Sequence, residues 1–402
     1  MLYHLVRPVA RFTLARFYRT IDLTGLQHIP RDAPVILAAN HPTAFIEPCL
    51  MACFQNRPLH FLARGDFFRN GLAAVLLRAL HILPVYRMQD GGYEQLTRNY
   101  DTFEACYRAL SKSRALMILA EGRCIHEKRL RPLRKGTARI ALGALDRDNT
   151  LGEVYIVPVG VNYSAPERVR STVMIRCGEP LRTSAYLAGY RANEAAGLRE
   201  LTEDLHAALS PLVVQLPEPD TDDAYQTLLE VHRNGAGTAE YGVTHHGKLL
   251  DAELAAMSSG RTDVGAARRY ASELYTQRLT DQALLGGSDR PSWWRMLVAA
   301  LLLLPQLPLW VLAEGIALTG PKRIEFYSPL RFATVAVGQL LYLPLLFVLP
   351  GWAVAWVVAS TFTQGWALCT WEEGMHRRER ARFRKLPIDV RDRLRRARAE
   401  LI

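Results

Sequence analysis

The chain has 402 residues, a formal net charge of +11 and a sequence pI of about 9.5. This length is sufficient for two or three domains, and the positive balance is typical of proteins that meet nucleic acid, an anionic membrane surface or phosphorylated substrates. The six cysteines form no C-x-x-C pair and no His cluster completes a zinc pattern, so the sequence predicts no metal site and indicates a reducing compartment.

Residues 1–20 are expected to form an amphipathic N-terminal helix. Apolar residues alternate there with Arg7, Arg11, Arg16 and Arg19. A basic amphipathic helix either lies on a membrane surface or packs on its own domain with its arginines in solvent, and the sequence leaves both open. The segment lacks the uninterrupted apolar core and the small-residue cleavage site of a signal peptide.

Residues 21–183 alternate short apolar runs with amphipathic segments, which is typical of an α/β domain. Strands are predicted at 21–29 (with a turn), 34–39, 59–63, 82–85, 115–119, 154–160 and 172–176. Helices are predicted at 48–55, 71–80, 92–112 and 136–146. A polar region, 184–291, follows with helical patterns but no chemical motif; these patterns lie at 196–214, 222–233 and 263–284.

Two apolar blocks, 294–318 and 332–371, predict membrane segments within residues 292–375. The first block is long enough to span a bilayer, but Pro305 and Pro308 interrupt it. The second block is about twice a spanning length, so it is expected to form two passes joined by a tight turn, or a deep hairpin.

The segments that flank the second block are basic. They are the connector 319–331 and a tail at 376–402, and the positive-inside rule assigns both to the cytoplasmic side. If the α/β domain is also cytoplasmic, the first block should be a re-entrant kink at its prolines. A true span there would place one basic segment outside.

A histidine and a glutamate lie between the predicted strand 34–39 and the predicted helix 48–55. His41 follows the strand, and Glu47 is six residues further along the chain. At the carboxyl end of a strand in an open α/β sheet, such a pair is the minimum set for a general base and the group that orients it. A capping or core histidine explains His41 on its own equally well.

Four strand ends carry polar or special residues, in chain order. They are Asn40-His41 with Glu47; Arg64-Gly65-Asp66; Glu121-Gly122-Arg123 followed by the basic run Arg129 to Ala138; and Val157-Pro158-Val159-Gly160. Because the carboxyl ends of parallel strands meet at one edge of a sheet, these blocks are candidates for a single site.

This set, in this order, resembles the glycerolipid acyltransferase family, which includes the 1-acylglycerol-3-phosphate acyltransferases, over about residues 20–180. The run Arg129 to Ala141 (RLRPLRKGTARIA), preceded by Glu121-Gly122, is the most specific match. The sequence departs from the family pattern in the acid, which is Glu47 rather than an aspartate one residue earlier, and in Ala120, where proline is usual. Family members with proline after the histidine, as in Pro42, often have the longer spacing.

The resemblance implies an acyltransferase α/β domain with a mixed, mostly parallel sheet at 21–183. It implies a membrane-bound O-acyltransferase that moves a fatty acyl group from acyl-CoA or acyl-carrier protein to the hydroxyl of a lysophospholipid, above all 1-acylglycerol 3-phosphate. His41 would be the general base and Glu47 its orienting carboxylate. The remaining site residues would bind substrate: Asn40, Arg64, Glu121, Gly122, Arg131, Arg134 and Lys135.

The acyl carrier would be a co-substrate, so no cofactor is expected. The enzyme would be integral to a phospholipid membrane with its catalytic domain on the cytoplasmic face. Two alternatives remain open, a glycerol-3-phosphate acyltransferase and a weakly active, membrane-associated lipid-binding homologue. Nucleic-acid binding is disfavoured, because the arginines cluster beside apolar segments and no nucleic-acid motif occurs.

Overall fold

A computed structural model describes residues 2–86, 99–237, 241–258, 263–286, 293–345 and 347–402. Within these residues, nine strands form one sheet in the order β4-β3-β5-β2-β6-β7-β1-β9, with β8 paired to β6. The strands are β1 (Thr20–Thr24), β2 (Val35–Ala39), β3 (Leu59–Arg64), β4 (Ile82–Val85), β5 (Ala115–Leu119), β6 (Tyr155–Tyr163), β7 (Thr172–Cys177), β8 (Leu181–Arg182) and β9 (Gly242–Thr244). The pairs β6–β7 and β6–β8 are antiparallel and the other pairs are parallel, so the sheet is mixed and mostly parallel, as predicted.

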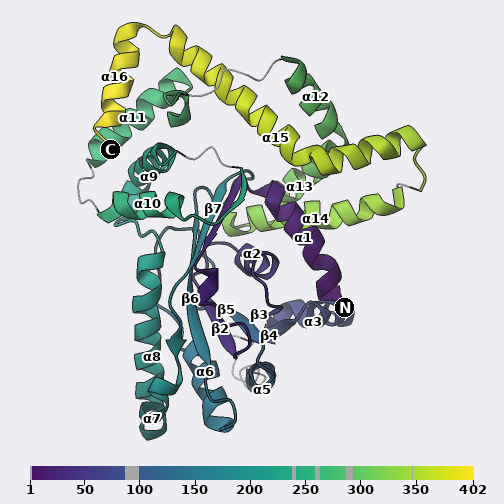
Figure 1. Ribbon diagram of the computed structural model, residues 1–402, viewed down its shortest axis with the longest axis vertical. Coiled ribbons are helices and arrows are strands. Elements are labelled where there is room, and N and C mark those ends of the chain that lie inside the picture. The colour runs from purple at the N-terminus through teal and green to yellow at the C-terminus, as the bar shows by residue number, and fades with distance from the viewer. Residues whose placement is uncertain (1, 87–98, 238–240, 259–262, 287–292, 346) are drawn as a thin grey trace.

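Helices cover both faces of the sheet, which explains why its central strands are apolar throughout (Figure 1). One face packs against α1 (Leu2–Phe17) and α2 (Ile46–Phe54). The other packs against α5 (Asn99–Leu110), α6 (Gly136–Arg147) and α8 (Glu194–Leu209). Along β2, alternate residues enter the two cores, as the two-residue period of a strand requires. Of the predicted helix 92–112, residues 92–98 lie outside the described residues.

Helix α1 packs on its own domain. Its residues Leu14 and Phe17 are fully buried in the core that contains α2, whereas Leu5 near its start is exposed. Of the two arrangements that the sequence left open, the structure shows the packed one for the second half of the helix.

The region after residue 183 packs on the α/β domain and extends its sheet, rather than forming a separate domain. It contains α7 (Ser184–Ala192), α8, α9 (Asp222–Gly235), α10 (Lys248–Ser258) and α11 (Val264–Gln277). Strand β9, which is not among the strands that the sequence predicts, pairs in parallel with β1 at the edge of the sheet. Helix α16 (Ile388–Ala399), which the sequence places in a basic tail, buries Leu394 in a core shared with α9 and α11.

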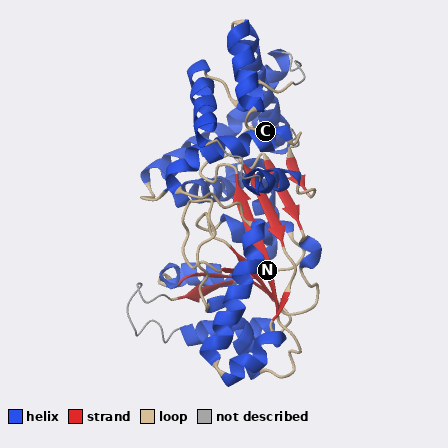
Figure 2. Ribbon diagram, turned by 90° about the vertical axis from the view of Figure 1, so that its left-hand side faces the viewer, coloured by secondary structure: helices blue, strands red, loops and turns tan. Residues whose placement is uncertain are grey.

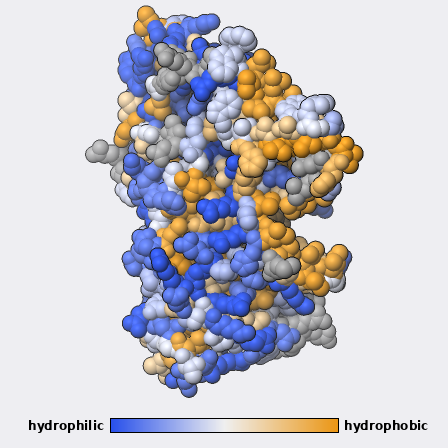
Figure 3. All heavy atoms as spheres, turned by 45° about the vertical axis from the view of Figure 1, so that its right-hand side comes forward, coloured by the Kyte–Doolittle hydropathy of each residue, from blue (hydrophilic) through white to orange (hydrophobic). Residues whose placement is uncertain are grey.

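The apolar blocks form helices at the end of the molecule opposite α7 (Figures 1 and 2). These are α12 (Trp293–Leu303), α13 (Leu307–Thr319), α14 (Tyr327–Leu345) and α15 (Gly351–Lys385), and α12 packs along α15 while α13 packs along α14. A short 3-10 turn at Leu304–Gln306, which contains Pro305, separates α12 from α13. Among the described residues, the stretch Trp293–Thr319 is long and apolar enough to cross a membrane. Apolar side chains gather on the surface of this end of the molecule (Figure 3).

A buried ion pair ties α15 to the acyltransferase-like domain. Arg170, between β6 and β7, donates from Nε to Glu372 Oε1 at 2.5 Å and from Nη2 to Glu372 Oε2 at 3.1 Å. Its Nη1 also donates to the carbonyl oxygens of Arg16 and Tyr18, both at 3.0 Å. One side chain therefore joins the β6–β7 connection, the end of α1 and the long C-terminal helix. The short α3 (Gly71–Ala79) lies between β3 and β4.

Candidate active site

Asn40 fixes the end of β2 against β6. Its Nδ2 donates to the carbonyl oxygen of Val161 at 2.9 Å, and its Oδ1 accepts from the Val161 amide at 2.8 Å. The side chain is buried, with both ends of its amide engaged by one strand residue. The structure therefore places Asn40, a predicted substrate-binding residue, where it positions the catalytic turn.

The structure brings His41 and Glu47 together. Nδ1 of His41 lies 3.7 Å from Oε2 of Glu47, and the two side chains are 8% and 0% exposed. This separation is longer than a hydrogen bond, as is common for catalytic pairs before substrate binds. Since Nδ1 faces Glu47, the opposite ring nitrogen, Nε2, is the one directed away from the carboxylate. A substrate hydroxyl that approaches there would meet an imidazole whose other nitrogen, Nδ1, faces the Glu47 carboxylate.

Glu47 is held by the local fold. It lies in the first turn of α2, where the helix dipole stabilises a negative charge, and its Oε1 accepts from the Thr43 amide at 2.7 Å. The turn Pro42 to Phe45 lets the chain reverse from β2 into α2, and this reversal returns the carboxylate to the histidine. The six-residue spacing of His41 and Glu47 is thus compatible with contact.

Two buried tyrosines, which the sequence reasoning did not select, surround this carboxylate. Burial, followed by the charge of Glu47, raises the pKa of both Tyr18 and Tyr163 well above the usual value. Their ring centroids are 6.0 Å apart, and both residues are fully or almost fully buried. The phenols therefore remain protonated at neutral pH, within electrostatic reach of the buried Glu47 carboxylate. No local sequence signal links Tyr163 to a turn more than a hundred residues away.

Glu121 connects the third block of the site to the first. Its Oε2 accepts from the backbone amide of His41 at 2.7 Å, and its Oε1 accepts from the backbone amide of Arg131 at 2.9 Å. The Arg131 guanidinium also donates to Glu121 Oε2 at 2.6 Å. Glu121 is 5% exposed, and these three hydrogen bonds engage both oxygens of its carboxylate. It fixes the backbone at His41 and the start of the basic run.

Gly122 has a positive φ of 73°, a conformation that favours glycine. A Cβ at this position would lie 3.0 Å from Cγ of Arg134. The absence of a side chain at this position therefore permits both the backbone turn and the close approach of the Arg134 side chain. This places the stem of Arg134 directly beside the end of β5.

The predicted basic residues differ in how much of their charge is available. Arg131 is committed to Glu121, and Arg64 pairs with Asp66 at 2.7 Å. The side chains of Arg134 and Lys135 are exposed, and neither makes a hydrogen bond or an ion pair with the described residues. Of the basic run, these two are thus the ones whose charge is open to an anionic ligand.

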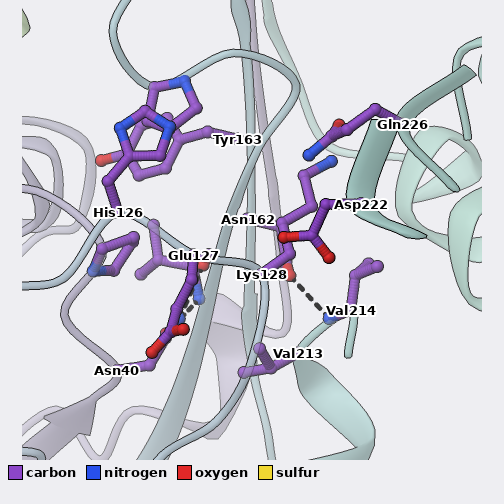
Figure 4. A pocket seen from close by; sticks show the side chains of 13 residues that line it. Asn40, His126, Glu127, Lys128, Asn162, Tyr163, Val213, Val214, Asp222 and Gln226 are labelled. Atoms are coloured by element: carbon purple, nitrogen blue, oxygen red, sulfur yellow. Dashed lines mark hydrogen bonds between the residues drawn. The ribbon is translucent and has the colours of Figure 1, made fainter. Parts of the chain in front are cut away.

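A cavity of about 200 Å³ adjoins the catalytic turn on the β6 side (Figure 4). Asn40 and Pro42, on either side of His41, line one part of it. The helical region supplies other parts of its wall, and Asn162 accepts there from the Val214 amide at 2.8 Å, shown as a dashed line in Figure 4. The lining residues also include His126, Glu127, Lys128, Tyr163, Val213, Asp222 and Gln226. The region 184–291 thus completes the surroundings of the site.

Cys124, close to the site, is not an activated nucleophile. Burial, and then the charges of Glu325 and Glu47, raise the pKa of its thiol. Only the thiolate is strongly nucleophilic, so a raised pKa opposes covalent catalysis by this residue. Within the described ranges, no group of three or more His, Cys, Asp or Glu side chains is arranged to hold a metal ion.

Comparisons with known proteins point to the same chemistry. The family model described as Acyltransferase matches residues 20–162. Glycerol-3-phosphate O-acyltransferase 1 of Saccharomyces cerevisiae is 26% identical over 133 residues, and glycerol-3-phosphate O-acyltransferase 2 of the same yeast is 27% identical over 130 residues. Each of these matches covers 32% of this chain and 17% of the yeast protein.

A further relative is an uncharacterized acyltransferase of Schizosaccharomyces pombe, 28% identical over 290 residues, with 51% of this chain and 43% of that protein covered. The chain therefore spans less than half the length of these curated relatives. Among solved structures, the 1-acyl-sn-glycerophosphate acyltransferase PlsC from Thermotoga maritima aligns with a TM-score of 0.38 and 15% identity, over 52% of this chain and 79% of that one.

The family match begins at β1 and ends within β6, so it contains the His41–Glu47 pair, Glu121 and the basic run. The site geometry and the family match thus fall on the same residues. Residues 20–162 thus form a domain of the acyltransferase family, and it is through this domain that the chain resembles the glycerolipid acyltransferases.

Proposed function

We propose that this chain transfers a fatty acyl group from a thioester donor, acyl-CoA or acyl-carrier protein, to the hydroxyl of a lysophospholipid, with 1-acylglycerol 3-phosphate as the preferred acceptor. The observation that carries the proposal is the contact of His41 with Glu47 at the end of β2, inside the acyltransferase domain. A neutral imidazole is suited to this task, because its pKa lies near the operating pH.

In the proposed reaction, His41 Nε2 accepts the proton of the acceptor hydroxyl as the oxygen attacks the thioester carbonyl. Glu47 stabilises the imidazolium through Nδ1, which is the base-and-orienter arrangement of the serine triad. The tetrahedral intermediate then collapses, the C–S bond breaks, and the departing thiolate takes the proton from His41. An ester bond replaces the thioester bond, and no residue of the chain is acylated.

The acceptor phosphate would bind to cations beside this pair. Arg134, whose side chain passes Gly122, and its chain neighbour Lys135 have unpaired charges, and Arg64 offers a planar fork for phosphate oxygens. In this proposal Glu121 and Arg131 act by shaping the loop that presents these groups. The phosphates of coenzyme A are alternative ligands of the same basic run.

The enzyme is proposed to be integral to a membrane, with its domain on the cytoplasmic face. The Ala44 amide donates to the carbonyl oxygen of Glu325 at 3.2 Å, so the connector between α13 and α14 lies on the domain. Near the other end of Trp293–Thr319, the Met296 side chain lies against Gly374 of α15, two residues from the Glu372 that pairs with Arg170. Both ends of this stretch are thus on the domain's side, which supports a re-entrant kink at Pro305. Packing of α16 on α9 and α11 supports a hairpin of α14 and α15.

Glycerol 3-phosphate is the second candidate acceptor. Two of the curated relatives carry the name glycerol-3-phosphate O-acyltransferase, and each of them aligns with about a third of this chain. The same base and the same cations would serve this acceptor, since it presents a hydroxyl and a phosphate in the same relation. A lipid-binding homologue of low activity would retain the fold and the membrane helices without turnover.

An acceptor panel tests the proposed function. The purified full chain in detergent would be given radiolabelled acyl-CoA or acyl-carrier protein with 1-acylglycerol 3-phosphate, glycerol 3-phosphate and lysophospholipids of other headgroups. The highest kcat/KM is expected with 1-acylglycerol 3-phosphate. Preference for glycerol 3-phosphate would select the second candidate, and the absence of transfer to any acceptor would contradict both.

Glu47→Gln should lower kcat much more than it changes either KM. The substitution keeps the size of the side chain and removes the charge that stabilises the imidazolium. The corresponding loss in a serine triad is about 10⁴-fold, and the longer contact here makes a loss of roughly 10²-fold the expectation. Steady-state kinetics measure it, with Glu167→Gln, a partly exposed carboxylate beside His126, as the control. An unchanged kcat would mean that another group orients His41.

A further inference from the structure

A segment outside the family domain lies directly on the catalytic turn. It is the connector between α13 and α14, which contains the 3-10 helix Ile324–Phe326. The carbonyl oxygen of Glu325 accepts from the Ala44 amide at 3.2 Å, and Ala44 is three residues after His41. The family match ends at residue 162, so family resemblance assigns nothing to this segment.

The connector carries a cation, Arg323, two residues before the Glu325 carbonyl that accepts from Ala44. The charge of Arg323 lowers the pKa of the Cys124 thiol, against the larger opposing effects of burial, Glu325 and Glu47. Cys124 thus lies within electrostatic reach of both the catalytic carboxylate and the Arg323 guanidinium. The amide of Ile125, the next residue, donates to the carbonyl oxygen of His41 at 3.2 Å, so this thiol belongs to the immediate surroundings of the base.

The arginines of the family motif that point inward are already paired. Arg129 is bound to Asp222, and Arg131 is bound to Glu121. Arg323 is exposed, and its guanidinium makes no hydrogen bond or ion pair with any residue that the structure describes. Glu325, two residues further on, is not within ion-pair distance of it in the described part of the chain. An unpaired guanidinium two residues from a contact with the His41 turn is suited to bind a bidentate anion there.

We propose that Arg323 binds the phosphate of the glycerolipid acceptor and thereby helps to select a phosphorylated lipid. This rests on the proposed acyl transfer. The connector joins the ends of two helices with exposed apolar faces, α13 and α14, so a lipid seated along them would present its headgroup at Arg323. That position favours the acceptor lipid over coenzyme A as the source of the phosphate. The site would thus be shared between the acyltransferase domain and the C-terminal helices.

Arg323→Ala is the test, in the purified full chain. The KM for 1-acylglycerol 3-phosphate should rise roughly ten- to a hundredfold, as expected for loss of a charge-assisted hydrogen bond, while the KM for the acyl donor stays constant. Arg323→Lys should recover part of the loss. Lys322→Ala, which removes the neighbouring exposed charge, is the matched control and should change neither KM. Transfer to 1-monoacylglycerol, which lacks the phosphate, should be equal in wild type and Arg323→Ala.

Binding of radiolabelled 1-acylglycerol 3-phosphate in detergent micelles, measured without a donor, makes the test independent of turnover. Weaker binding by Arg323→Ala than by Lys322→Ala, with unchanged melting temperatures, supports the inference. An unchanged acceptor KM and unchanged binding would overturn it, and so would a raised donor KM with a constant acceptor KM, since that result assigns Arg323 to coenzyme A. Absence of acyl transfer in the wild type would contradict the proposed function, while the binding comparison would still decide the role of Arg323.

Discussion

His41→Ala is expected to lower kcat for acyl transfer by roughly 10²- to 10⁴-fold, which is the contribution of a positioned general base. Without the imidazole, the acceptor hydroxyl must lose its proton to water while it attacks. The backbone at this position is held by Glu121 and by Asn40, whose contacts do not involve the imidazole. The variant should therefore remain folded, with both substrates still bound.

Initial rates with a radiolabelled donor, together with circular dichroism and a melting curve, check this prediction. His206→Ala, a half-buried histidine on α8 that has no part in the proposed reaction, is the control for loss of a histidine. A rate within a fewfold of wild type in a folded His41→Ala protein would remove His41 from the chemistry. A simultaneous loss of folding would instead make His41 a structural residue.

Arg170→Ala is expected to destabilise the protein by roughly 3–5 kcal/mol, because it leaves the buried Glu372 carboxylate without its counter-ion. Side chains of the pair are 15% and 12% exposed, so water replaces the lost contacts poorly. The carbonyl oxygens of Arg16 and Tyr18 lose a donor as well. The effect should be largest where α15 meets the acyltransferase domain.

Denaturant unfolding of the purified protein in detergent measures this loss. Arg168→Ala, whose side chain is 77% exposed two residues away, is the control and should be close to neutral. The double variant Arg170→Ala/Glu372→Ala should lose less than the sum of the two single variants, because only the double variant leaves no lone buried charge. Additive losses, or a neutral Arg170→Ala, would show that the pair does not hold α15 to the domain.

The strands and the proximity of His41 to Glu47 could be predicted because their signals are local. The apolar run Val35–Ala39 specifies a buried strand, and the turn that follows carries both His41 and Glu47 within seven residues. The mixed, mostly parallel sheet followed from resemblance to the family and is confirmed by the pairing of the strands. In each of these cases the residues that decide the structure are near one another in the chain.

The features that sequence reasoning missed depend on distant pairs. Strand β9 pairs with β1 across more than two hundred residues, and its three residues are too few to give a strand pattern in the sequence. The resemblance implies a substrate-binding role for Glu121, and the sequence does not indicate that this carboxylate also accepts from the backbone amide of His41, 80 positions away. The contact of Glu325 with Ala44 joins residues even further apart in the chain, and nothing in either segment alone indicates it.

The central claim is that His41 activates the acceptor hydroxyl for direct attack on the thioester. One measurement tests it most directly: rapid-quench analysis of purified wild type and His41→Ala with a donor labelled in its acyl chain, with and without 1-acylglycerol 3-phosphate, counting label in lipid product and on protein. We predict that wild type places the label in the diacyl product when acceptor is present and never on the protein. His41→Ala should label neither the lipid product nor the protein. Label retained covalently by the chain, at Cys124 or elsewhere, or equal product from His41→Ala, would contradict the account.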